Sequence, residues 1–181
     1  MSDDAKLRFA TLAVQRDLAS DHVELSPVVM PNVVSYGSED RCAPELALAL
    51  SELPSEARPH TVARLLLPDG VRLEHVDVEV ARGELPGRLG RPFPIGLTVA
   101  VVPEPRDGAP PAGHWVFVPA LGHAVFVSRK EDIATRLAAE LAVLPTALAL
   151  DLDGWRRLIT HAPSRLVSVD VERGFIDFSI S

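Results

Sequence analysis

The sequence is poor in the residues that most chemical sites require. It has one cysteine, Cys42, which excludes an internal disulfide and a zinc site built from several thiolates. Aromatic residues make up only 5% of the chain, so a base-stacking platform of the RNA-binding kind is not supported. No Gly-x-Gly-x-x-Gly or phosphate-loop pattern occurs. We therefore expect no cofactor and no metal.

Basic charge and long apolar runs are also scarce. Lys and Arg number 18 against 25 Asp and Glu, a net charge of −7, whereas phosphate-backbone binders need a basic face. Apolar runs such as 95–102 are short and bounded by Pro, Gly or charge, which excludes a membrane-spanning helix. The first residues lack the profile of a signal peptide. These features predict a cytoplasmic protein that binds neither nucleic acid nor a membrane.

What the chain does have is an internal repeat within its 181 residues. An apolar block recurs in order and spacing: Ala43, Leu46, Ala47, Leu50, Leu53 and Pro54 match Ala134, Leu137, Ala138, Leu141, Leu144 and Pro145. A second block recurs at an offset two residues larger: Arg64, Leu65, Arg72, Leu73 and Val76–Glu79 match Arg157, Leu158, Arg165, Leu166 and Val169–Glu172. Compositional bias explains the first block but not the second. The pattern predicts a duplication.

Each copy has the same order of expected elements. Alternating apolar residues predict three strands, at 6–15, 22–29 and 32–36 in the first copy and at 95–103, 114–119 and 123–127 in the second. A polar turn beginning at Arg16 follows the first strand. An amphipathic helix comes next, then a shorter helix (61–67 or 155–161) and a last strand (72–80 or 165–172).

The expected fold class is therefore α+β, with two tandem pseudo-symmetric β-β-β-α-α-β repeats, mainly antiparallel sheets and helices on one face. The first repeat covers 1–83, a linker rich in Gly, Pro and Arg covers 84–94, and the second repeat covers 95–181. Ser128 and Glu131 form a capping-box signature before the second long helix. Pro54 and Pro145 are expected to end the two long helices.

Two residue pairs keep an enzymatic alternative open. His22 and His114 begin the second strands of the two copies, and imidazoles can bind metals or relay protons. The stretch around Asp151 and Asp153 resembles the first motif of haloacid-dehalogenase-type phosphatases, whose two aspartates act beside magnesium. Trp155 stands where that family has another residue. The structural alternatives are that the two histidines are polar residues at a strand end and that Asp153 caps a helix. A small hydrolase or ligand-binding enzyme is thus the alternative to a protein without catalytic residues.

The last residues of the sequence predict an interaction surface. Residues 175–180 alternate between apolar and polar side chains, as a strand does, and a strand edge can recruit a partner strand. A last strand that packs on its own sheet is the competing interpretation. The candidate contacts with a protein or peptide partner are Phe175, Ile176, Phe178 and Ile180, together with Arg88 and Arg91 of the linker.

Two family resemblances bear on function. The segment 31–40, followed by the apolar stripe of Leu46, Leu50 and Leu53, resembles the HicB-like antitoxin fold, which implies a three-stranded sheet and an amphipathic helix. The duplicated organisation is similar to that of the recognition domains that precede the motors of Clp/HSP100-type AAA+ ATPases. That likeness implies a non-enzymatic adaptor, the N-terminal substrate- or partner-binding domain of a larger machine. A homodimeric ligand-binding protein is a further alternative.

Overall fold

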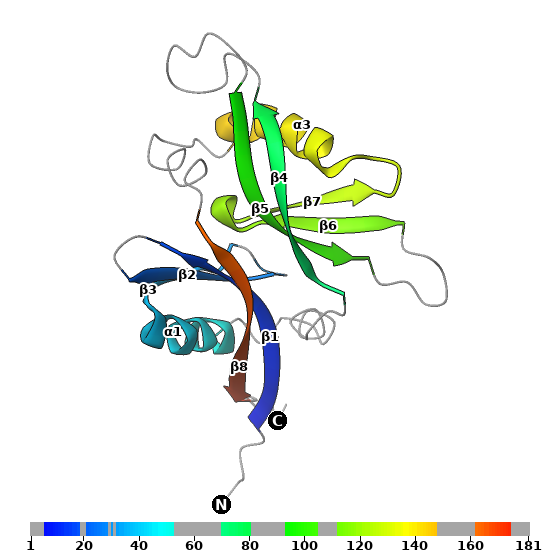
Figure 1. Ribbon diagram of the computed structural model, residues 1–181. Helices are drawn as coiled ribbons and strands as arrows, with labels where there is room; N and C mark the ends of the chain where they lie inside the picture. The colour runs from blue at the N-terminus through cyan, green and yellow to red at the C-terminus, as the bar shows by residue number, and fades with distance from the viewer. Residues whose placement is uncertain are drawn as a thin grey trace, which may run out of the picture. The chain divides into compact units, whose positions relative to one another are not determined.

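The computed structural model describes residues 6–18, 21–28, 30, 32–52, 70–80, 93–104, 112–147 and 162–174. The chain divides into two compact units, the first built from 1–68 with 163–181 and the second from 69–162. In the described residues each unit holds a four-stranded antiparallel sheet and one α-helix (Figure 1). The α+β class is thereby confirmed. No helix of the described part has the length and apolar character needed to cross a membrane.

The first unit is a sheet with strand order β3-β2-β1-β8 and a helix, α1, that contacts β2, β3 and β8. Its core forms because α1 buries one apolar stripe against one face of the sheet. The elements are β1 (Lys6–Asp17), β2 (His22–Pro27), β3 (Ser35–Ser38), α1 (Glu39–Ser51) and β8 (Ser164–Gly174). The buried core residues are Phe9, Ala13, Val23, Leu25, Cys42, Leu46, Leu50, Val169 and Val171.

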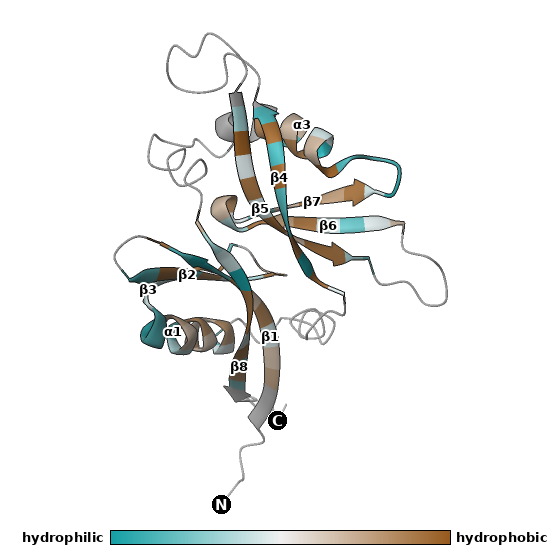
Figure 2. Cartoon of the chain, viewed as in Figure 1, coloured by the Kyte–Doolittle hydropathy of each residue, from teal (hydrophilic) through white to brown (hydrophobic). Residues whose placement is uncertain are grey.

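The second unit has strand order β4-β5-β6-β7, and its helix α3 contacts β4 and β7. Figure 2 shows brown apolar bands along β4, β5 and β7, where valines alternate with other residues. Leu137 and Leu141 of α3 pack into this core and are almost fully buried. The elements are β4 (Arg72–Val80), β5 (Phe93–Pro103), β6 (Gly113–Val118), the short 3-10 helix η1 (Pro119–Leu121), β7 (His123–Ser128) and α3 (Ile133–Ala147).

The helix ends differ from those predicted. Asp132, not Ser128, caps α3, since its Oδ2 accepts the backbone N–H of Thr135 at 2.9 Å. The carboxylate of Glu131 instead accepts the N–H of Ser128 at 2.9 Å and closes the turn before the helix. The expectation that Pro145 ends this helix is wrong: α3 continues to Ala147, because the fixed φ of proline is compatible with helical backbone. Residue 54 lies outside the described ranges.

Each sheet takes its fourth strand from the other half of the sequence. β4 follows α1 along the chain but pairs antiparallel with β5, from Arg72↔Val101 to Val80↔Phe93. β8 follows α3 but pairs with β1. The compact units therefore differ from the division at 83 and 95, because the two last strands are exchanged. The shorter helices expected at 61–67 and 155–161, and most of the linker, lie outside the described residues.

Candidate functional site

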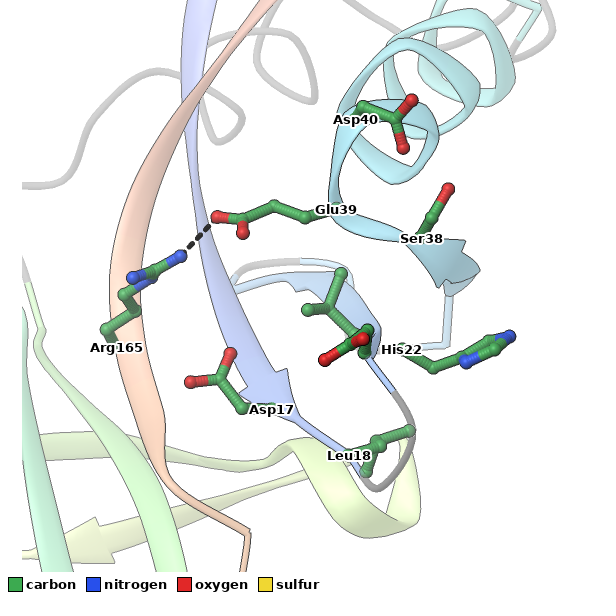
Figure 3. A pocket seen from close by; sticks show the side chains of 9 residues that line it. Asp17, Leu18, His22, Ser38, Glu39, Asp40 and Arg165 are labelled. Carbon is green, nitrogen blue, oxygen red and sulfur yellow. Dashed lines mark hydrogen bonds and ion pairs between the residues drawn. The ribbon is translucent and has the colours of Figure 1, made fainter.

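The first unit contains a pocket of about 850 Å³, formed by the β1–β2 turn, the start of α1 and the start of β8 (Figure 3). Four carboxylates line it. Asp17 ends β1, Asp21 lies in the turn, and Glu39 and Asp40 form the first turn of α1. Among the lining residues, the side chain of Arg165 of β8 supplies a permanent positive charge. The pocket is therefore acidic.

Local sequence preferences place these carboxylates. Asp21 has a positive φ of 57°, a left-handed conformation that aspartate tolerates better than most residues, and it lets the backbone N–H of Leu18 donate to the carbonyl of His22 at 2.8 Å. Ser38 has the extended backbone of a helix N-cap, with φ −69° and ψ 152°. Acidic residues directly after an N-cap interact favourably with the helix dipole. The turn and the helix start thus both favour acidic residues here.

Interactions within the pocket leave an excess of negative charge. The guanidinium of Arg165 pairs with the carboxylate of Glu39, the pair joined by the dashed line in Figure 3. The side-chain amide of Gln15 donates to Asp17 Oδ1 at 3.0 Å and to Glu39 Oε1 at 3.5 Å. One cation and one amide therefore face four carboxylates. A cationic ligand group would find complementary charge in this pocket.

The pocket adjoins the edge of its sheet. β3 is the end strand of its sheet, and Ser38, its last residue, lines the pocket. Among the described residues of this unit, the large exposed apolar side chains are Val34 at 48%, Tyr36 at 61% and Leu48 at 59%, and all three belong to β3, the residue before it, or α1. The ring of Tyr36 packs against His22, with centroids 5.7 Å apart. The exposed ring of Tyr36 and the acidic pocket therefore both adjoin the end strand β3.

The histidine pair predicted from the sequence lies in two different units. His22 begins β2, has an exposed side chain and lines the acidic pocket. His114 lies in β6, and its buried Nδ1 atom has no hydrogen-bond partner. Within the described ranges, no group of three or more His, Cys, Asp or Glu residues is arranged to hold a metal ion.

The thiol of Cys42 is fully buried under the sheet. It donates to the carbonyl of Val23 at 3.4 Å. Burial raises the pKa of Cys42 above the ordinary value of a thiol, and the charges of Glu45 and Asp40 act in the same direction, while a hydrogen bond with Ser35 lowers it. A neutral, inaccessible thiol is a poor nucleophile, so this residue is part of the core.

The remaining sequence candidates are not described by the structure. They are Asp151, Asp153, Arg88, Arg91, Phe175, Ile176, Phe178 and Ile180. Conversely, sequence reasoning missed Tyr36 and the four pocket carboxylates. The acidic pair after Ser38 is a recognisable helix start, but nothing in the sequence indicated that the β1–β2 turn would lie beside it.

Comparisons with protein-family models, curated proteins and solved structures find no significant match to this chain.

Proposed function

We propose that this protein is a non-enzymatic recognition module that binds an extended segment of a partner protein along β3. A basic side chain of that segment enters the acidic pocket. The observation that carries the proposal is that Ser38 both ends the edge strand β3, next to the exposed Tyr36, and lines a pocket with excess carboxylate.

An end strand offers unpaired main-chain groups to an incoming strand. β3 has only 4 residues, so few main-chain hydrogen bonds are available and side-chain contacts must add to them. Val34 and Tyr36 are two residues apart, which places them on the same side of an extended chain. They provide an apolar surface for a residue of the partner segment.

The charge of the pocket sets the second requirement. A guanidinium binds carboxylates with two parallel hydrogen bonds, so arginine fits the pocket better than lysine. Ser38 is both the end of β3 and part of the pocket. A segment that pairs antiparallel with β3 would therefore carry its arginine before its apolar residues.

We also propose that the two units descend from one duplicated α+β module. In both sheets the two long strands, β1 with β8 and β5 with β4, form a pair at one end of the strand order, which supports this proposal. So does the burial of residues 9–18 and 95–104, which follows the same order of buried and half-buried positions. On this proposal the acidic pocket of the first unit serves as the partner-binding part of a larger assembly.

The direct test is a binding titration with a labelled peptide, Arg-Ser-Val-Thr-Val. We expect saturable binding that weakens with added salt, and loss of roughly 10-fold in affinity, about 1.4 kcal/mol, when Glu replaces the Arg of the peptide. Asp40→Asn and Tyr36→Ser in the protein should each weaken binding of the Arg peptide. Trp115→Ser, which changes an exposed aromatic residue of the other unit, is the matched control and should not. Equal binding of the Arg and Glu peptides would refute the proposal.

A further inference from the structure

The exchanged strands are matched to each other in sequence and in position. The motif Val-Asp-Val-Glu occurs at 76–79 in β4 and at 169–172 in β8. In β8, Val171 faces Phe9 of β1, and in β4, Val78 faces Ile95 of β5. All four of these side chains are buried in the cores of their sheets.

The strands that receive β8 and β4, which are β1 and β5, pair with them in the same way. All 11 residues of β8 pair with β1, and all 9 residues of β4 pair with β5. Each helix also packs on the strand that comes from the other half of the sequence, since α1 contacts β8 and α3 contacts β4. A sheet without its exchanged strand would lose an edge ladder and part of the core under its helix.

We propose that β1 and β5 are strand-receiving sites of one specificity, and that the two halves of the chain hold each other by reciprocal donation of their last strands. Residues 1–80 donate β4 to the second sheet, and residues 93–174 donate β8 to the first. The partner of each half is the other half of the same chain. The halves are therefore not two domains that fold side by side.

The competing arrangement makes a different prediction from the same sequence. Because β4 and β8 share a motif, β4 would fit β1 and β8 would fit β5 in two independent domains. The two arrangements differ in which residue faces Leu12 of β1. In the exchanged arrangement it is Ser168, and in the independent one it is His75, the position of β4 that matches Ser168 in the repeat.

A disulfide trap on the full chain separates the two. Leu12→Cys and Ser168→Cys are combined in a Cys42→Ala background, and Leu12→Cys with His75→Cys is the matched control. Residues that face each other across an antiparallel pair have Cβ atoms about 4.5–5.5 Å apart, close to what a disulfide needs. A protease site placed between residues 80 and 93 allows the folded, oxidised protein to be cut.

Reciprocal donation predicts that the cut 12/168 protein runs at the mass of the full chain on a non-reducing denaturing gel, and as two fragments once reduced. The cut 12/75 protein shows two fragments in either arrangement, because both cysteines lie in the first fragment, and reciprocal donation predicts that both of its thiols still react with a maleimide after oxidation. Without any added cysteine, the cut protein should elute as one species in native buffer and separate only in denaturant. A 12/75 cross-link, a disulfide between two chains, or separation of the cut fragments in native buffer would overturn the proposal.

Discussion

Arg16 and Glu24 face each other across β1 and β2, with 2.8 Å between Nη1 of the arginine and Oε1 of the glutamate. Their side chains are only 7% and 9% exposed. Val23 and Leu25 pack toward α1, so Glu24 between them points to the opposite face of the sheet. The first sheet thus has a buried ion pair on its second face.

Removing one partner of this pair should destabilise the protein strongly. Glu24→Ala removes the carboxylate that Arg16 contacts on β2, and we expect a loss of about 3–5 kcal/mol in the free energy of unfolding. The double variant Arg16→Met/Glu24→Leu removes both charges and should lose less than Glu24→Ala. Urea denaturation measures both. A loss below about 0.5 kcal/mol for Glu24→Ala would show that the pair is not buried in solution.

The end of β1 differs from the one predicted from the sequence. Arg16 and Asp17 were expected to begin a polar turn, because charged residues follow an apolar strand. β1 in fact includes both, since Arg16 has its counter-ion on the neighbouring strand. A single sequence does not reveal which charges will be paired after folding. Strand 72–80, whose residues alternate clearly, was predicted to the residue.

Gly113 should be intolerant of any side chain. A Cβ at this position would clash with the backbone carbonyl oxygen of Val127 and lie 2.7 Å from the ring of Phe126. Because the backbone of a paired strand can move only at a cost in free energy, we expect Gly113→Ala to lower the free energy of unfolding by about 1–3 kcal/mol. Gly37→Ala is the control, since its Cβ would meet only Cys42 Sγ, at 3.9 Å. Thermal unfolding of the two variants should differ; equal midpoints would contradict the packing described for β6 and β7.

The hydroxyl of Thr11 is buried in β1 without a hydrogen-bond partner. Valine has nearly the same shape and no polar atom, so Thr11→Val should stabilise the protein by about 1 kcal/mol. Thr135→Val is expected to act in the opposite direction, because the hydroxyl of Thr135 bonds Asp132 Oδ2 at 3.0 Å. Chemical denaturation of both variants checks the two signs, and a destabilised Thr11→Val protein would mean that the hydroxyl has a partner in solution.

Asp132 should make stability depend on pH in the acid range. The backbone N–H of Thr135, followed by its hydroxyl, holds the pKa of Asp132 below its ordinary value. A depressed pKa contributes stability that is present above about pH 4 and is lost as pH falls through the folded-state pKa. Asp132→Asn keeps a capping oxygen but carries no charge, so it should unfold with a weaker acid dependence. Midpoints measured from pH 6 to pH 2 would contradict this if the two proteins lose stability in parallel.

The candidate site and the strand exchange were beyond prediction for different reasons. The pocket is formed by the end of β1, a turn, the start of α1 and the start of β8, and most of its residues are ordinary polar ones. Only tertiary structure brings them together. The exchange was hidden because β4 and β8 share one motif, so local periodicity finds both strands but does not tell which sheet edge receives each. Most strands and the two long helices, by contrast, follow from their alternation and apolar stripes, whereas β3 lies at Ser35–Ser38 instead of the predicted 32–36.

The most direct test of the recognition proposal is residue-resolved mapping of the Arg-Ser-Val-Thr-Val peptide on the full chain by backbone amide NMR. We predict that saturating peptide shifts the amides of 35–38, 17–18 and 21–23 and protects those of β3 from hydrogen exchange, while β6 and β7 are unchanged. Shifts confined to the second unit, or no shift at β3 with bound peptide, would contradict it.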